Sequence, residues 1–64
     1  MRYFVLHYVT GKILFRRDAA GAWSRRDPDG WTAVEIDREA FDQDPFVREI
    51  DADQARAFEA ELVA

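Results

Sequence analysis

The stretch YFVLHYVTGKILFRR, residues 3–17, constrains the fold of this chain more than any other. Residues 3–10 are almost all β-branched or aromatic, and such side chains fit a pleated strand better than a helical turn. Thr10-Gly11-Lys12-Ile13 predicts a two-residue hairpin loop, with Gly11 at the position that requires a positive φ. We therefore expect an antiparallel hairpin whose second strand covers residues 13–17.

Both faces of this hairpin are apolar. The predicted loop places Val9 opposite Leu14 and His7 opposite Arg16, and the strand period of two then sorts the side chains into two sets. One set is Phe4, Leu6, Tyr8, Ile13 and Phe15, and the other is Tyr3, Val5, Val9 and Leu14, with His7 and Arg16 among them. A strand that is apolar on both faces is expected to be covered on both.

Length and composition indicate one small domain, residues 1–64. A chain of this size buries only about 60% of the surface that its unfolded form exposes. It has no cysteine, so neither disulfides nor a thiolate metal site can add to the core. Oligomerisation is the remaining common way to supply one.

The N-terminal apolar run is too short to span a membrane, and His7 interrupts it. Lys12, Arg16 and Arg17 follow before any small-residue cleavage site, which a signal peptide would need. We expect a cytoplasmic protein with no membrane partner.

A repeated motif, R-R-D-x-x-G, begins at Arg16 and again at Arg25, and a tryptophan follows each copy. Aspartate at the first position and glycine at the last are typical of type I turns. Two such turns in succession predict an antiparallel meander with further strands near 22–26 and 31–36. The sheet, residues 3–36, would then have about four strands.

The second half of the chain is predicted to be mainly helical. Asp37 can cap a short helical turn over 38–43, and Phe46 to Ile50 is expected to be extended or irregular. Asp51 with Gln54 forms a capping-box pattern before a helix over 52–63. Its apolar stripe is Ala55, Phe58 and Leu62. We predict an α+β fold, with this C-terminal helix packed on the face of Phe4, Leu6, Tyr8 and Phe15.

No catalytic, cofactor or metal motif stands out. His7 is the only histidine and is interpreted as a plain strand residue. The carboxylates between Asp42 and Asp53 lack the central glycine of a calcium loop, and Pro45-Phe46-Val47 interrupts them. We expect neither an enzyme nor a cofactor.

The charges are unevenly distributed along the chain. Residues 1–32 hold six Lys/Arg and three Asp/Glu, a net of +3, and residues 33–64 hold three Arg and ten Asp/Glu, a net of −7. The two halves can attract each other within the fold or across a dimer.

A four-stranded sheet is about 19 Å wide and one helix covers about 10–12 Å, so the C-terminal helix and the 38–46 segment together can cover one face but not both. The second apolar face is then free, unless the 38–50 segment folds back over it. The predicted partner-binding residues are Tyr3, Val5, Val9, Leu14, Arg16, Trp23 and Trp31. The sequence thus favours a non-catalytic protein-interaction module that associates with a second copy or another protein through this face.

The alternative is a nucleic-acid-binding domain that uses the pairs Arg16-Arg17 and Arg25-Arg26 with Trp23 and Trp31. Successive turns of a meander lie at opposite ends of a sheet, which would separate the two pairs by roughly 15 Å. The net charge of −4 would also repel a polyanion.

Overall fold

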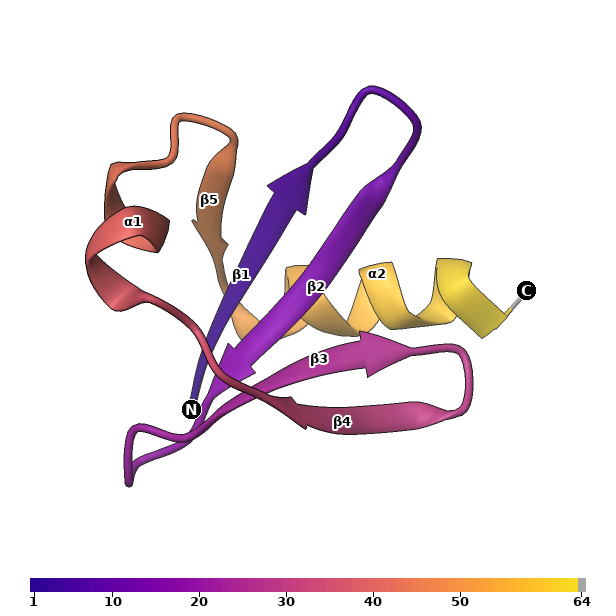
Figure 1. Ribbon diagram of the computed structural model, residues 1–64. Helices are drawn as coiled ribbons and strands as arrows, with labels where there is room; N and C mark the ends of the chain where they lie inside the picture. Colours follow the sequence, from indigo (N-terminus) through magenta and orange to yellow (C-terminus); the bar gives the residue numbers. More distant parts are fainter. Residues whose placement is uncertain (64) are drawn as a thin grey trace.

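The computed structural model describes the backbone of residues 1–63 and the side chains of residues 1–61. It is a five-stranded antiparallel sheet with one helix on each face (Figure 1). The strands are β1 (Arg2–His7), β2 (Lys12–Arg17), β3 (Trp23–Asp27), β4 (Gly30–Val34) and β5 (Val47–Ile50), and the helices are α1 (Arg38–Gln43) and α2 (Ala52–Val63). The strand order is β4-β3-β2-β1-β5, so β2 is central.

The predicted α+β class, the meander and the C-terminal helix are confirmed. The sheet has one strand more than predicted, because β5 pairs antiparallel with β1. Residues 35–46 carry the chain, with α1, across one face from the β4 edge to the β1 edge. This long connection lets a short segment without clear alternation complete the sheet.

The predicted register of the first hairpin is wrong by four residues. Val5, not Val9, lies opposite Leu14, and His7 lies opposite Lys12. Residues 8–11 form the connection, in which the N–H of Tyr8 donates to the carbonyl of Gly11 at 2.6 Å. Burial determines this register, since it brings the large apolar side chains of β1 and β2 opposite one another. Because the shift is even, the division into two faces survives.

The first face forms a core with α1. Phe4, Phe15 and Phe41 are buried together, and the Phe41 ring meets the other two edge-on at 5.6 and 5.5 Å between centroids. Asp37 caps this short helix by accepting a hydrogen bond from the Ala40 N–H. Phe41 is the one residue of α1 in the buried core.

The C-terminal helix covers the opposite face to the one predicted. Ala55 is buried against Val5 and Leu14, and Phe58 packs on the same cluster. The reason is steric, since α1 already occupies the Phe4 face and the chain leaving β5 turns to the other side. Leu62 of the predicted stripe lies outside the described side chains.

The predicted capping box of α2 is confirmed. The Gln54 N–H donates to Asp51 Oδ1 at 2.7 Å, and the Asp51 N–H donates to Gln54 Oε1 at 3.1 Å. Each bond satisfies a backbone N–H that has no partner within the helix. The start of α2 is therefore fixed at Ala52, with Asp51 the single residue between this helix and β5.

The glycines of all three predicted turns, Gly11, Gly21 and Gly30, stand where a positive φ is favoured, and the structure has a positive φ at two of them. Gly21 and Gly30 have φ of +88° and +144°, and Gly11 is not in this region. The difference follows from the register, which places Gly11 in a longer connection rather than at the first central position of a two-residue loop.

We predict that Gly30→Ala lowers the free energy of unfolding by about 1 kcal/mol or more, because alanine is strained at this φ. Gly11→Ala is the matched control, since a methyl group there meets nothing within 4 Å. Urea unfolding of the two variants measures the difference. Equal losses in both would contradict the backbone geometry described for these turns.

Candidate functional site

The apolar sheet face that was predicted to be free is covered. Val5 is 4% exposed and Leu14 0% exposed, beneath Ala55 of α2. Tyr3 is partly buried in the same cluster. Val9 lies in the β1–β2 connection, where it is fully exposed. Tyr3, Val5, Val9 and Leu14 therefore do not form one exposed patch, and the expectation of a free face is wrong because α2 packs on it.

The two tryptophans lie on opposite faces of the sheet. Trp31 is on the α2 side, where the Arg16 guanidinium lies 4.2 Å from its ring centroid. Trp23 is on the α1 side, with its ring 4.9 Å from that of Phe41. Cation–π attraction favours the position of Arg16. Arg16 and Trp31 therefore share the α2 face, and Trp23 lies on the opposite one.

The two arginine pairs are closer than predicted but point in different directions. Arg16 lies opposite Ser24, so Arg25 and Arg26 are within two residues of it along β3. The expected separation by a strand length is wrong, because a short loop returns the chain directly from β2 to β3. Alternation places Arg16 and Arg26 on the α2 face and Arg17 and Arg25 on the α1 face.

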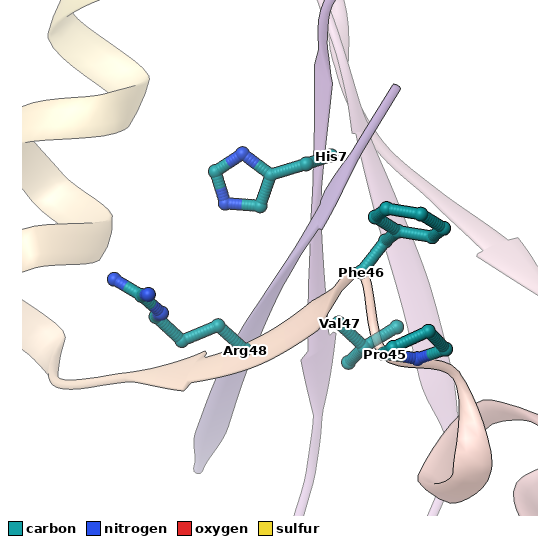
Figure 2. A pocket seen from close by; sticks show the side chains of 5 residues that line it. All are labelled: His7, Pro45, Phe46, Val47 and Arg48. Carbon is teal, nitrogen blue, oxygen red and sulfur yellow. The ribbon is translucent and has the colours of Figure 1, made fainter. Parts of the chain in front are cut away.

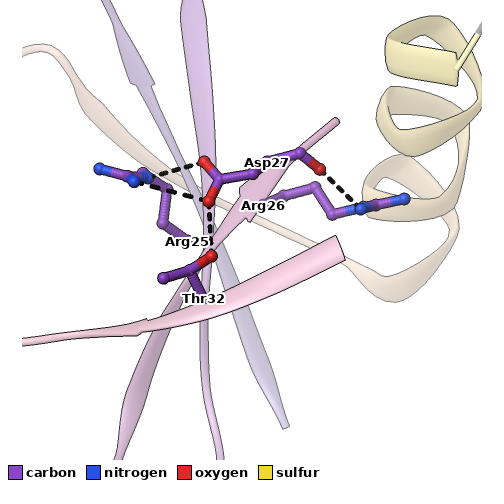
Figure 3. Close-up of polar contacts among 4 residues, drawn as sticks. All are labelled: Arg25, Arg26, Asp27 and Thr32. Carbon is purple, nitrogen blue, oxygen red and sulfur yellow. Dashed lines mark hydrogen bonds and ion pairs between the residues drawn. The ribbon is translucent and has the colours of Figure 1, made fainter. Parts of the chain in front are cut away.

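Arg25 and Arg26 are held by contacts within the chain (Figure 3). Arg25 Nε donates to Asp27 Oδ1 at 2.9 Å, and the Thr32 hydroxyl donates to Asp27 Oδ2 at 2.5 Å. The bonds from Thr32 and Arg25 hold the pKa of Asp27 below its usual value. Arg26 Nη1 donates to the Asp27 carbonyl at 2.7 Å, and Arg26 Nε lies 3.8 Å from Glu59 Oε1. Each arginine pair is thus divided between two faces, and Arg25 and Arg26 are engaged in contacts within the chain.

Three other basic side chains gather where β1 ends and β2 begins. His7 lies directly opposite Lys12. Arg48 of β5 lies opposite Val5, which places it on the same face as His7 and diagonal to it. Within the described part of the chain, none of the three takes part in an ion pair. We refer to His7, Lys12 and Arg48 as the basic cluster.

A groove of about 190 Å³ lies between the basic cluster and α2. Its other lining residues are Val5, Ile50, Gln54 and Phe58. Val5 is buried, and Ile50 and Phe58 are partly buried, so the floor of the groove is apolar. In Figure 2 the side chains of His7 and Arg48 extend to the same side of the sheet, toward α2. The groove thus combines a positive rim with an apolar floor.

A second hollow, of about 250 Å³, adjoins the groove because both are lined by His7 and Arg48 (Figure 2). The remaining lining residues are Pro45, Phe46 and Val47. Phe46 is 64% exposed. Its N–H donates to Asp44 Oδ1 at 2.9 Å, and its carbonyl accepts from the His7 N–H at 3.0 Å. These bonds fix the backbone from which the aromatic ring is displayed.

Glu49, the next residue after Arg48, directs its charge to the opposite face. Arg2 Nε and Nη2 donate to its two carboxylate oxygens at 2.9 and 2.7 Å. This hydrogen bonding lowers the pKa of Glu49 and raises the pKa of Arg2. Alternation along β5 places Glu49 on the α1 side and Arg48 on the α2 side. Glu49 therefore does not neutralise the basic cluster.

This site is not apparent from the sequence. The predicted register places His7 opposite Arg16 rather than Lys12, and Arg48 lies in a segment that was not predicted to pair with the sheet. Phe46 was expected only in an extended segment. A cue existed in the apolar pairs Val5–Leu14 and Phe4–Phe15, which favour the observed register over the turn signal.

No family model matches this sequence, and no curated protein or solved structure was found to be similar to it. Among residues 1–63, no helix has the length and apolar character needed to cross a bilayer. The same part of the chain contains no group of three or more His, Cys, Asp or Glu side chains that could hold a metal ion. The site is therefore interpreted from its geometry and charge.

We predict that Phe46→Ser changes the free energy of unfolding by less than about 0.5 kcal/mol, because the ring is largely exposed. Phe41→Ser, which removes a ring that is 8% exposed, should cost about 3 kcal/mol or more. Chemical unfolding of both variants makes the comparison. A large loss for Phe46→Ser would show that this ring belongs to the core and is not displayed for a partner.

Proposed function

We propose that this chain is a non-catalytic interaction module that binds another protein through the basic cluster and Phe46. One observation carries the proposal: two adjoining hollows share His7 and Arg48, with unpaired cations along one and an exposed aromatic ring beside the other. Arginine and aromatic side chains displayed beside hollows are enriched at protein interfaces.

The surface offers the residue types that dominate protein interfaces. Binding energy is concentrated in a few aromatic and arginine side chains near the centre of a contact. Burying Phe46 against a partner would contribute about 1.5–3 kcal/mol from its apolar area. Arg48 adds a planar guanidinium that suits paired hydrogen bonds to a carboxylate.

Binding is favoured over catalysis by the surroundings of His7. No side-chain hydrogen bond or ion pair found among residues 1–61 joins its imidazole to a carboxylate or a hydroxyl group. The charged groups that share its two hollows, Lys12 and Arg48, carry no acceptor that could orient the ring for proton transfer. The cytoplasmic location expected above stays a prediction.

A second copy of this chain is the other candidate partner, and the charge distribution favours it. Residues 33–64 carry a net charge of −7, so an acidic helix of one copy can approach the basic cluster of another. Such a contact joins two different surfaces and would extend into chains of molecules rather than close as a two-fold dimer.

The test is affinity capture from extract of the native host with the immobilised parent and three variants. A partner held by the parent should be lost from Arg48→Glu and from Phe46→Ser. Arg38→Glu is the matched control: it makes the same change in charge at an exposed residue of α1, on the other face. Equal capture by all four proteins would overturn the proposal.

Sedimentation over a wide concentration range, with the same proteins, identifies a second copy as the partner. Self-association of the parent and of Arg38→Glu that disappears in Arg48→Glu would support the second candidate. A parent that stays monomeric at high concentration excludes that candidate and leaves a different protein as the partner.

A further inference from the structure

We infer that the groove beside the basic cluster binds an acidic segment of the partner protein, in which a carboxylate side chain stands next to a large apolar one. The inference rests on the proposed function and specifies the chemistry of the partner. The charge of the rim and the character of the floor support it independently.

The basic side chains at the rim of the groove favour the binding of an anion. His7 and Lys12 stand directly opposite each other on neighbouring strands, and Arg48 lies diagonal to His7 on the same face. A carboxylate placed among them would be attracted by the charges of Lys12 and Arg48 and can accept a hydrogen bond from the His7 imidazole. Arg48 is exposed, so its guanidinium is accessible to a carboxylate with paired hydrogen bonds.

The apolar floor of the groove favours a ligand that carries an apolar group beside that anion. A simple ion at the rim would leave the surfaces of Ile50 and Phe58 exposed to water. The groove holds about 190 Å³, which is less than the range of about 300–1,000 Å³ for small-molecule sites. It is suited to one large side chain from a partner whose remaining contacts lie elsewhere, with Phe46 in the adjoining hollow.

A nucleic acid fits the groove less well than an acidic peptide. The helix α2, which contributes Gln54 and Phe58 to the groove, carries Asp53, Glu59 and Glu61 against a single Arg56 over residues 52–61, with Glu59 close to Arg26. A regular row of phosphates extending from the basic cluster along this helix would meet like charges. An acidic protein segment can place its carboxylates at the rim alone and pass the helix with neutral residues.

Fluorescence anisotropy with labelled synthetic peptides tests this chemistry. The first probe has a Glu-Glu-Phe-Glu centre, the second replaces its phenylalanine with serine, and the third replaces its glutamates with lysine. At low salt the first should bind, and the other two should bind at least about tenfold more weakly. Added salt should weaken the first complex.

The protein variants locate the binding. Arg48→Glu and Lys12→Glu should each weaken binding of the first peptide by about tenfold or more, and the control Arg38→Glu by less than about threefold. All three residues are exposed, and thermal melts establish that each variant is folded. Indifference to Arg48→Glu, or equal affinity for the three peptides, would overturn the inference.

A single-stranded oligonucleotide serves as competitor. If it binds more tightly than the acidic peptide and depends on the same residues, the groove takes a phosphate backbone and the inference is wrong.

Failure of the inference is distinguishable from failure of the proposed function. A partner captured in an Arg48- and Phe46-dependent manner, with no affinity for the acidic peptide, would keep the site and overturn its chemistry, whereas capture unaffected by either variant would overturn both.

Discussion

The rest of this structure depends on the pairing of β1 with β2, in which Val5 lies opposite Leu14 and Phe4 opposite Phe15. These adjacent pairs point to opposite faces, so the two central strands require an apolar layer on each side. All four side chains are at most 8% exposed. The hairpin is therefore stable only when an apolar layer covers each of its faces, and the two helices provide these layers.

Each helix covers its face of the hairpin with few residues. The short helix α1 contributes Phe41 to one face, and α2 contributes Ala55, with Phe58 at the edge, to the other. A helix as short as α1 has little stability of its own, so tertiary packing of Phe41 must hold it in place. With Val5 and Leu14 beneath α2, and Phe4 and Phe15 beneath α1, the surface that we propose for a partner lies where β1 ends. The basic cluster and Phe46 lie there.

Local signals in the sequence predicted local structure well. The Asp51–Gln54 capping box, the turns at Gly21 and Gly30 and the spans of both helices depend on neighbouring residues, and the structure has them as expected. At Thr10-Gly11 a local turn signal competed with the long-range burial of Val5 and Leu14, and burial determined the register. The side of the sheet that α2 covers depended on the path of residues 35–46, which no local pattern specifies.

The candidate site could not be predicted for the same reason. His7 and Lys12 meet only in the observed register, and Arg48 joins them only because β5 pairs with β1. A basic cluster assembled from three strands has no continuous sequence pattern. Several of the predicted partner-binding residues, such as Leu14 and Trp23, were selected because they are large and apolar. Such side chains pack in or against the core.

The measurement that tests this account most directly is the set of nuclear Overhauser contacts of the Phe58 ring in solution. With α2 on the Val5 face, we expect contacts from this ring to the methyl groups of Val5 and Ile50, and none to the rings of Phe4 and Phe15. Contacts to Phe4 and Phe15 instead would place α2 on the other face. Val5 and Leu14 would then be exposed, and the partner surface would be the sheet face rather than the basic cluster.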